Sequence, residues 1–391
     1  MAGASFLPYT HILLPHKEVM TDQNAGAIAS IAAQNVRLSS PDQKFTVLGR
    51  QLDGPPMPDI TYQPLAPRHS WLSGQNIGLA RAYIHHLKSA PQPDLVEVHG
   101  RAQVARYICQ KRPDLPVVLY LHNDPREMKG ARNISDRAWL MTHLAGIICV
   151  SEHIKQCFLD GLSAAAVDEA KICAVLNGTT RHLCTPQPKQ NRILIIGRMV
   201  PEKGILPACR AVASILDEHP DWCLDVVGGR HFKTETPSAY EEQIAQTLGP
   251  VQTQIHLHGF QPASVTQGLQ DKAAISIVPS LWDEPCGLTG LEALAAGSAL
   301  LTTDRGGIPE YATGRAEIIP LTGTELSDAE AEQKFEQNLA THLRLLMTNT
   351  AYREKLQRQA WADFPFTAEN MVVNTTKARQ AFLSRFTNPA L

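Results

Sequence analysis

The sequence predicts an α/β fold with two domains, each a doubly wound parallel sheet covered by helices on both faces. The chain has 391 residues, which is long for a single hydrophobic core and typical of two domains. Its hydrophobic fraction of 43% and charged fraction of 19% are those of a globular protein. Strand-like runs that are apolar almost throughout alternate with helix-like segments, as in parallel sheets buried on both faces.

The first half of the chain begins with an apolar run and an alanine-rich amphipathic segment at 25–36, which predict a strand and then a helix. Four more apolar runs follow with helix-like segments between them. The predicted buried strands lie at residues 10–15, 45–49, 95–99, 117–122 and 146–150.

The second half repeats this pattern after a break at residues 183–190, where Pro186 and Pro188 interrupt regular structure. A last helix is predicted near residues 369–386. The predicted strands lie at residues 193–197, 224–228, 254–257, 274–278, 299–302 and 316–319.

Residues 282–297 are the most informative stretch, because they place two carboxylates, Glu284 and Glu292, around a glycine turn that opens a small-residue helix. The strand at 274–278 comes just before. Free backbone N–H groups at the start of the helix, near 287–289, form an anion site. Glu292 lies about one turn into that helix and still reaches a ligand at its mouth. An anion that carries hydroxyls, such as a nucleotide diphosphate sugar, fits this arrangement.

Arg198 and Lys203 follow the strand that ends at Gly197, at the sheet edge where doubly wound folds bind ligands. Arginine offers a planar fork to phosphate oxygens and lysine a compact charge. The alternative interpretation is a surface arginine and a helix-capping lysine.

Four ordered motifs resemble those of the retaining glycosyltransferases of family 4, which have the GT-B fold. Residues 284–292 resemble the E-x7-E signature, and residues 193–204 resemble the strand-G-R-x-x-x-E-K-G element. Residues 175–179 resemble the V-x-N-G loop, and residues 306–310 resemble the G-G-x-P-E loop. The resemblance implies two Rossmann-like domains facing across a cleft. Residues 1–185 would bind the acceptor, 186–365 would bind the nucleotide sugar, and 366–391 would form a helix crossing back to the first domain.

The resemblance also implies roles for residues of the second domain. Glu284 would bind donor sugar hydroxyls and Glu292 the ribose hydroxyls, while Arg198 and Lys203 would hold the diphosphate and neutralise charge as it leaves. Cys286, where the family commonly has Phe, is a departure that would reshape the sugar pocket. The implied donor-binding residues are Gly26, Arg198, Lys203, Glu284, Cys286, Gly287, Leu288, Thr289 and Glu292.

In the first domain, His122 ends the strand at 117–122, where the family places a histidine against the sugar's O6. The following Asn-Asp-Pro is the context of some bacterial members that build lipopolysaccharide and exopolysaccharide. His99 and Arg101 are candidates for the acceptor side, and Gly26 for close backbone approach to the diphosphate. The implied catalytic residues are His122, Arg198, Lys203 and Glu284.

No D-x-D signature is present, so the resemblance implies a metal-independent enzyme in which the two cations replace a divalent ion; no cofactor is expected. Eight cysteines without a C-x-x-C pair, several in apolar runs, predict reduced thiols and a cytoplasmic location. The N-terminus lacks the pattern of a signal peptide. No apolar run approaches the roughly 18–20 residues that span a bilayer.

Residues 101–137 hold eight Lys and Arg but four Asp and Glu. This basic segment could contact an anionic membrane at its inner face, or a phosphorylated acceptor; the alternative is an ordinary solvated helical face. No long basic run indicates nucleic acid.

The leading hypothesis is a retaining transferase that moves a hexose from a nucleotide-diphosphate sugar to a saccharide or lipid-linked acceptor in bacterial envelope polysaccharide synthesis. UDP-hexose is favoured over GDP-mannose as the donor. The alternatives are a GT-B nucleotide-sugar epimerase or phosphorylase, or a non-catalytic nucleotide-sugar-binding protein. A hydrolase with paired carboxylates is disfavoured, because the spacing of Glu284 and Glu292 across a turn suits two parts of one ligand.

Overall fold

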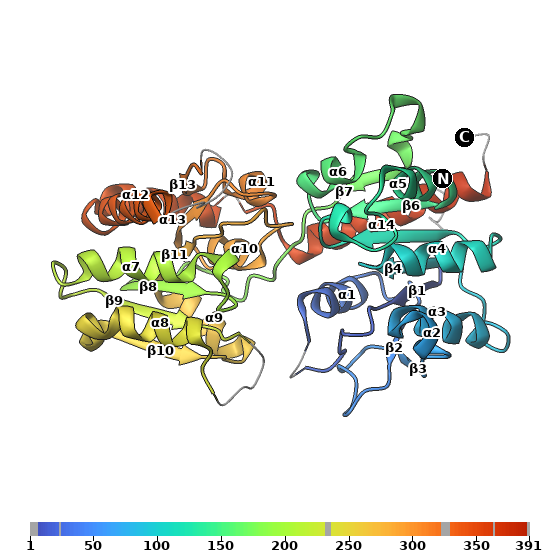
Figure 1. Ribbon diagram of the computed structural model, residues 1–391, viewed down its shortest axis with the longest axis horizontal. Helices are drawn as coiled ribbons and strands as arrows, with labels where there is room; N and C mark the ends of the chain where they lie inside the picture. Colours follow the sequence, from blue (N-terminus) through green and yellow to red (C-terminus); the bar gives the residue numbers. More distant parts are fainter. Residues whose placement is uncertain (1–6, 23–24, 231–235, 322–328, 363, 389–391) are drawn as a thin grey trace. The chain divides into compact units, whose positions relative to one another are not determined.

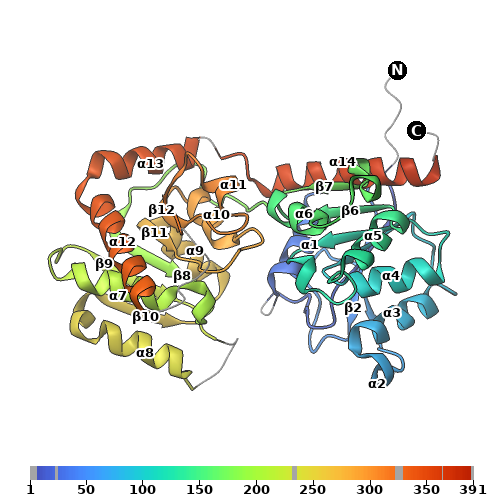
Figure 2. The same cartoon turned by 45° about the horizontal axis from the view of Figure 1, so that its top comes forward.

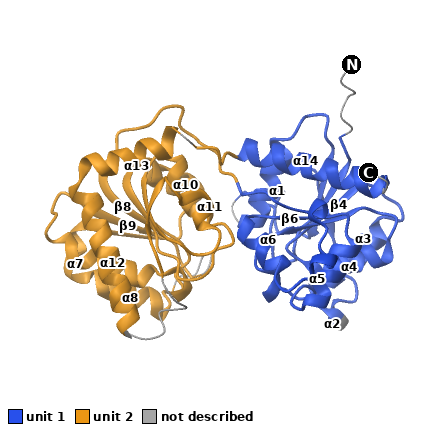
Figure 3. Ribbon diagram, turned by 90° about the horizontal axis from the view of Figure 1, so that it is seen from above, with its two compact units in different colours: residues 1–177, 368–391 blue, residues 178–367 orange. Residues whose placement is uncertain are grey.

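Two all-parallel sheets organise the chain in a computed structural model (Figure 1), which describes residues 7–22, 25–230, 236–321, 329–362 and 364–388. The chain divides into two units, residues 1–177 with 368–391 (unit 1) and residues 178–367 (unit 2), coloured separately in Figure 3. Neighbouring strands pair in parallel in both sheets. The predicted α/β class with two doubly wound parallel sheets is confirmed.

The sheet of unit 1 has the strand order β3-β2-β1-β4-β5-β6-β7. Its order reverses between β1 and β4, and at such a switch point the loops after the two strands diverge and leave room for a ligand. The edge strands β3 and β7 were not predicted; β3 is short and contains Gln63 and Pro64, and proline is tolerated only at a sheet edge. The strands are β1 Thr10–Leu13, β2 Phe45–Arg50, β3 Tyr62–Leu65, β4 Leu95–His99, β5 Val117–Leu121, β6 Gly146–Cys149 and β7 Ile172–Ala174.

The helices of unit 1 come from both ends of the chain. The last helix, α14, packs against β6 and α1 of this unit, and both Figure 1 and Figure 2 show it beside them. The α-helices are α1 Ala27–Arg37, α2 Ser70–Ser73, α3 Gln75–His86, α4 Ala102–Lys111, α5 Ile134–His143, α6 Glu152–Leu159 and α14 Ala368–Thr387.

The sheet of unit 2 has the order β10-β9-β8-β11-β12-β13, with its switch point between β8 and β11. Helices α7, α8 and α12 pack together, while α9, α10 and α13 pack against the central strands. The strands are β8 Gln190–Ile196, β9 Cys223–Val227, β10 Ile255–Gly259, β11 Ala273–Val278, β12 Ala299–Thr303 and β13 Ala316–Ile319. The α-helices are α7 Ile205–Leu216, α8 Ala239–Leu248, α9 Ala263–Lys272, α10 Leu288–Ala295, α11 Ile308–Ala312, α12 Ala329–Thr348 and α13 Thr350–Ala362.

Helix α14 is fixed to unit 1 by one close contact and one buried ion pair. A Cβ atom on Gly146 of β6 would lie 2.1 Å from the ring of Phe382, so only glycine lets α14 approach this closely. Arg379 donates from Nε and Nη2 to the two carboxylate oxygens of Glu97 on β4, each at 2.8 Å, and both side chains have no exposed surface. The C-terminal helix is therefore part of the core of unit 1.

The Gly146 contact predicts that Gly146→Ala lowers the melting temperature, because the new methyl group overlaps Phe382; overpacking of this kind costs about 1–3 kcal/mol. Gly268→Ala in α9 is the matched control, because nothing lies within 4 Å of its added Cβ and alanine favours the helix by roughly 0.5–1 kcal/mol. Differential scanning calorimetry of both variants tests this. An unchanged melting temperature for Gly146→Ala would contradict the packing of α14.

Candidate functional site

The sheet of unit 2 brings two polar loops to one edge. Strands β8 and β11 are parallel neighbours, with Leu194 opposite Ser276, so the loops that follow them leave the sheet at the same side. The loop after β8 carries Arg198 and Lys203, and the loop after β11 carries Glu284. This edge is also the switch point of the sheet, where doubly wound folds bind ligands.

Gly204 allows the backbones of these two loops to touch. Its φ of +65° is in the left-handed region, and a Cβ there would lie 1.9 Å from the carbonyl oxygen of Pro279. The Leu281 N–H donates to the Glu202 carbonyl at 3.0 Å and holds the loops together. Since glycine alone meets both requirements, Gly204 determines how closely Lys203 approaches the second loop.

Lys203 and Glu284 form the charged centre of this edge. Lys203 Nζ lies 2.5 Å from Glu284 Oε1, and Ser280 Oγ donates to the same oxygen. Glu284 is 6% exposed and Lys203 is 20% exposed, so the pair is shielded while the lysine still reaches solvent. The structure thus joins two residues that the sequence had placed on separate motifs.

Two side chains that sequence reasoning missed flank this pair. Lys203 Nζ lies 5.2 Å from the ring centroid of Trp282, a cation–π distance. Trp282 Nε1 is buried and has no hydrogen-bond partner among the described residues, and the same holds for Arg305 Nε. Buried N–H groups without partners are costly. The signal for Trp282 was its place inside the 282–297 stretch.

The Gly-Gly loop of residues 306–310 fixes the backbone of Glu284. Gly307 N–H donates to the Glu284 carbonyl at 2.7 Å. Gly306 has a φ of +59°, and a Cβ on it would lie 2.2 Å from that carbonyl oxygen. This motif was recognised only as a resemblance, and its contacts give it a physical role in positioning Glu284.

Helix α10 begins beside this carboxylate, and no side chain among the described residues caps its first N–H groups. Gly287, the residue before the helix, has a φ of +79°, and the Tyr311 hydroxyl donates to its carbonyl at 3.2 Å. Cys286 is buried, whereas Leu288 and Thr289 are partly exposed. Such a helix start presents partial positive charge to an anion.

Arg198 lies apart from the charged centre. Its side chain is 56% exposed, and its recorded ion pair is with Glu202 at 3.8 Å, a weak contact in solvent. The structure therefore does not join Arg198 to Lys203 and Glu284 in the way the motif suggested. Its guanidinium remains available at the same loop.

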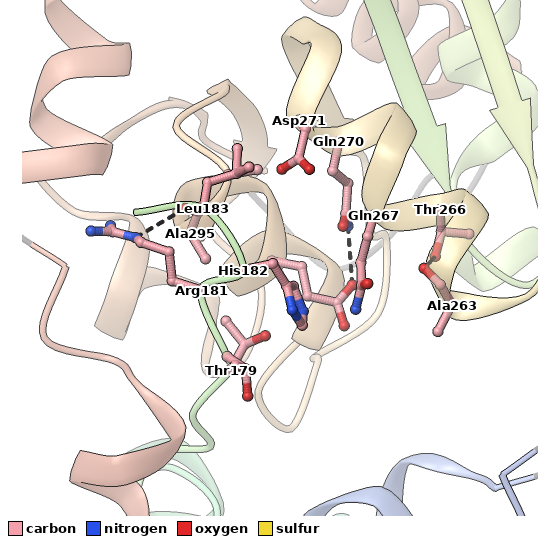
Figure 4. A pocket seen from close by; sticks show the side chains of 13 residues that line it. Thr179, Arg181, His182, Leu183, Ala263, Thr266, Gln267, Gln270, Asp271 and Ala295 are labelled. Carbon is pink, nitrogen blue, oxygen red and sulfur yellow. Dashed lines mark hydrogen bonds between the residues drawn. The ribbon is translucent and has the colours of Figure 1, made fainter. Parts of the chain in front are cut away.

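Glu292 lines a small cavity of about 60 Å³ (Figure 4) that Lys203 and Glu284 do not line. Gln270 of α9 donates to Glu292 Oε2 at 3.1 Å, and residues 179–183 form another part of the wall. Burial raises the pKa of the Glu292 carboxyl, and the hydrogen bond from Gln270 opposes this in part. Thr179 ends the segment that resembles the V-x-N-G loop, whereas Gln270 and residues 180–183 carry no sequence signal for this role.

In unit 1, His122 ends a chain of buried hydrogen bonds. His122 Nε2 lies 2.9 Å from His99 Nδ1, and His99 Nε2 lies 2.8 Å from Glu97 Oε1. The rings of His99, Tyr120 and His122 stack. Burial, together with the nearby His99, lowers the pKa of His122 well below its usual value, so His122 is neutral at pH 7.

His99 was expected to contact the acceptor, but its side chain has no exposed surface and both of its ring nitrogens hydrogen-bond to protein groups. Arg101 is partly exposed; its Nη1 donates to the Gly100 carbonyl at 2.6 Å. Only Arg101 of these two candidates can meet an acceptor directly.

Gly26 precedes α1, and the carboxylate of Glu18 occupies the start of this helix. Ala29 N–H donates to Glu18 Oε2 at 3.1 Å, and a Cβ on Gly26 would lie 2.6 Å from that oxygen. Burial raises the pKa of the Glu18 carboxyl, and Ala29 N–H and Arg101 oppose the shift. The glycine therefore gives room for an anion that the protein itself supplies.

The basic segment 101–137 is largely paired within unit 1. Arg106, Arg112 and Arg126 lie 2.6 Å, 2.7 Å and 2.7 Å from Asp136, Asp114 and Asp124, respectively. Arg137 is buried and donates to four backbone carbonyls. Its basic character is therefore smaller than the sequence count indicates.

Among the residues that the structure describes, no group of three or more His, Cys, Asp or Glu side chains could hold a metal ion. No helix among the described residues combines the length and the hydropathy that crossing a bilayer requires.

Comparison with known proteins follows the two units. Residues 37–181 match the family model described as Glycosyltransferase Family 4, and residues 185–361 match Glycosyl transferases group 1. The lipopolysaccharide 1,2-N-acetylglucosaminetransferase of Salmonella typhimurium is 25% identical in a 235-residue alignment that covers 56% of this chain and 57% of that protein.

Two solved structures share the fold. Anabaena Alr3699/HepE in complex with UDP and glucose gives a TM-score of 0.69 at 15% identity, covering 95% of this chain and 98% of that one. Sucrose-phosphate synthase of Thermosynechococcus elongatus gives a TM-score of 0.69 at 17% identity, covering 98% of this chain and 99% of that one. With both halves matched in the order of the two units, the protein belongs to the family 4 glycosyltransferases and has their GT-B fold.

Proposed function

We propose that this glycosyltransferase moves a hexose from a nucleoside-diphosphate sugar, with UDP-hexose ahead of GDP-mannose, to a saccharide or lipid-linked acceptor in bacterial envelope polysaccharide synthesis. The observation that carries the proposal is the Lys203–Glu284 pair beside the uncapped start of α10. The UDP complex of HepE and the name of the Salmonella transferase support the donor class and the envelope role.

On unit 2, Lys203 and Glu284 would each exchange the other for a group of the ligand when the donor binds. A diphosphate that approaches the uncapped N–H groups of α10 competes with Glu284 for Lys203 Nζ. Once Lys203 turns to the phosphate, Glu284 can accept hydrogen bonds from sugar hydroxyls. Arg198 adds a second cation from solvent, and the unpartnered Trp282 N–H is a further donor close by. Lys203 and Arg198 take the place of a divalent ion.

On unit 1, we assign His122 to the transferred sugar, Gly26 to the diphosphate and Arg101 to the acceptor. These assignments follow the motif positions, the partial exposure of Arg101 and the room that Gly26 leaves at the start of α1, which the Glu18 carboxylate occupies in the free protein. Ligand phosphate at α1 would compete with the Glu18 carboxylate. A lipid-linked acceptor would bring the enzyme to the inner face of the membrane.

The proposed chemistry retains configuration at the sugar carbon without an enzymic base. The leaving phosphate takes the acceptor's proton on the face from which it departs. The protein then stabilises an oxocarbenium-like sugar and a departing diphosphate through charges fixed in advance. Lys203 and the start of α10 carry most of this stabilisation on unit 2.

This mechanism predicts that Lys203→Ala lowers kcat by roughly 10²–10³-fold, because its partner charge grows as the bond breaks. The KM for the acceptor should change little. The measurement is release of nucleoside diphosphate from each candidate donor with a polysaccharide-precursor acceptor, together with analysis of the glycosylated product.

The matched control is Lys334→Ala, which removes an exposed lysine from α12 and should leave turnover unchanged. Circular dichroism confirms that both variants fold. Equal turnover in Lys203→Ala would contradict the role of Lys203. Nucleotide-sugar binding without any glycosylated product would favour a binding protein or an epimerase.

The ribose role proposed for Glu292 predicts opposite effects on stability and binding. The pKa of Glu292 is higher in the folded state than in the unfolded state, so ionisation of this carboxyl lowers the free energy of unfolding. This destabilisation is absent below the unfolded-state pKa and complete above the folded-state pKa. Glu292→Gln should therefore raise the melting temperature more at about pH 8 than at about pH 5. UDP binding should weaken by about 10–100-fold, since a charge-assisted bond to ribose is lost.

Thermal unfolding at the two pH values and calorimetric titration with UDP test the two halves of this prediction. A variant that is less stable at the higher pH would contradict the burial cost. Unchanged UDP affinity would remove Glu292 from the ribose site.

A further inference from the structure

Four buried side chains link the C-terminal helix to His122. Arg379 of α14 binds both oxygens of Glu97, Glu97 Oε1 meets His99 Nε2, and His99 Nδ1 meets His122 Nε2. Arg379, Glu97 and His99 have no exposed surface, whereas His122 is 8% exposed. The chain therefore has one end in the core and one end that can meet a ligand.

Glu97 fixes the direction of the first hydrogen bond. Burial alone would raise the pKa of the Glu97 carboxyl, but the bidentate Arg379 guanidinium outweighs burial and lowers it, so Glu97 is ionised. An ionised carboxylate can only accept. His99 Nε2 must therefore carry the proton and donate to Glu97.

Charge balance fixes the second bond. Arg379 already neutralises Glu97, and a protonated His99 would add an uncompensated cation to a site without solvent, which is costly. His99 is then neutral, with a lone pair on Nδ1. His122 Nε2 must donate to it, and in a neutral His122 this leaves the lone pair on Nδ1. No group among the described residues hydrogen-bonds that nitrogen.

We propose that Arg379, Glu97 and His99 are positioning residues that hold His122 in the Nε2–H tautomer, so that its Nδ1 accepts a hydrogen bond from the C6 hydroxyl of the donor hexose. The sugar contact rests on the proposed function, whereas the tautomer does not. A hexose with a C6 hydroxyl satisfies the lone pair. A 6-deoxyhexose leaves it unpaired, and a uronate brings a carboxylate that cannot donate to it.

The tautomer is tested without substrate by long-range ¹H–¹⁵N spectra of the full chain labelled at histidine, with His99→Asn and His122→Asn used to assign the signals. We expect His99 and His122 each to carry one proton, on Nε2, with a bare Nδ1. A doubly protonated His99, or a proton on His122 Nδ1, would overturn the proposal whether or not the protein transfers sugar.

The selectivity is tested by kcat/KM for UDP-glucose, UDP-6-deoxyglucose and UDP-glucuronate. The wild type should prefer UDP-glucose by about 10–100-fold over the 6-deoxy donor, as expected for an unpaired buried acceptor, and should prefer it over the uronate at least as strongly. Equal use of the three donors would overturn the selectivity, while turnover of none of them would exclude UDP-glucose as the donor and leave the spectra to decide the tautomer.

Variants of Arg379 separate positioning from folding. In Arg379→Met, Glu97 loses its partner, His99 gains a proton to compensate, and the proton on His122 moves to Nδ1, so the preference for UDP-glucose should fall toward unity. Arg379→Lys keeps the charge and should keep the tautomer. The control Arg353→Met removes a buried arginine that donates only to backbone carbonyls and Thr350 in unit 2, and should leave the selectivity intact. The decisive case is a folded Arg379→Met variant in which the His122 signal has changed. If that variant still prefers UDP-glucose as the wild type does, the link between tautomer and donor choice is overturned.

Discussion

The ion pair between Lys203 and Glu284 is the interaction on which the polar edge of unit 2 depends. It exists because β8 and β11 are parallel neighbours at the switch point and because Gly204 lets their loops touch. The pair compensates the lysine charge in the free protein. In the proposed function, an arriving anion takes over Lys203 and leaves the Glu284 carboxylate to accept from sugar hydroxyls. An ion pair this shielded must be partly desolvated, and the hydrogen bond from Ser280 to the carboxylate offsets part of that cost.

Unit 1 also has polar residues at the switch point of its sheet, but it arranges its charge pair differently. Its switch point lies between β1 and β4, and the polar residues there are His99, Arg101 and Glu18. Whereas Lys203 of unit 2 keeps some exposed surface, the charge pair of unit 1, Glu97 with Arg379, has none, and hydrogen bonds through His99 connect it to His122. The carboxylate therefore acts on a ligand only through the hydrogen bonds that it directs. The C-terminal helix is required for this arrangement, so it contributes chemistry as well as packing.

The sequence predicted what depends on local pattern. Apolar runs located most strands, and Lys203 and Glu284 were recognised because each follows a strand within a motif. The edge strand β3 was missed because its four residues include Gln63 and Pro64. Contacts between distant residues were also out of reach: Arg379 and Glu97 are 282 positions apart, and neither has a local signal. Burial of His99 follows from that contact, so its expected place at the acceptor could not be judged from the strand end alone.

We propose that unit 2 binds a nucleoside diphosphate through its own cations and backbone N–H groups. The most direct measurement is a thermal-shift panel with UDP, GDP, ADP and CMP, each with and without EDTA, since a ligand that binds only the folded state raises the melting temperature. We expect a clear rise with one diphosphate, UDP first, that EDTA does not change. No rise with any nucleotide, or a rise that EDTA abolishes, would contradict it.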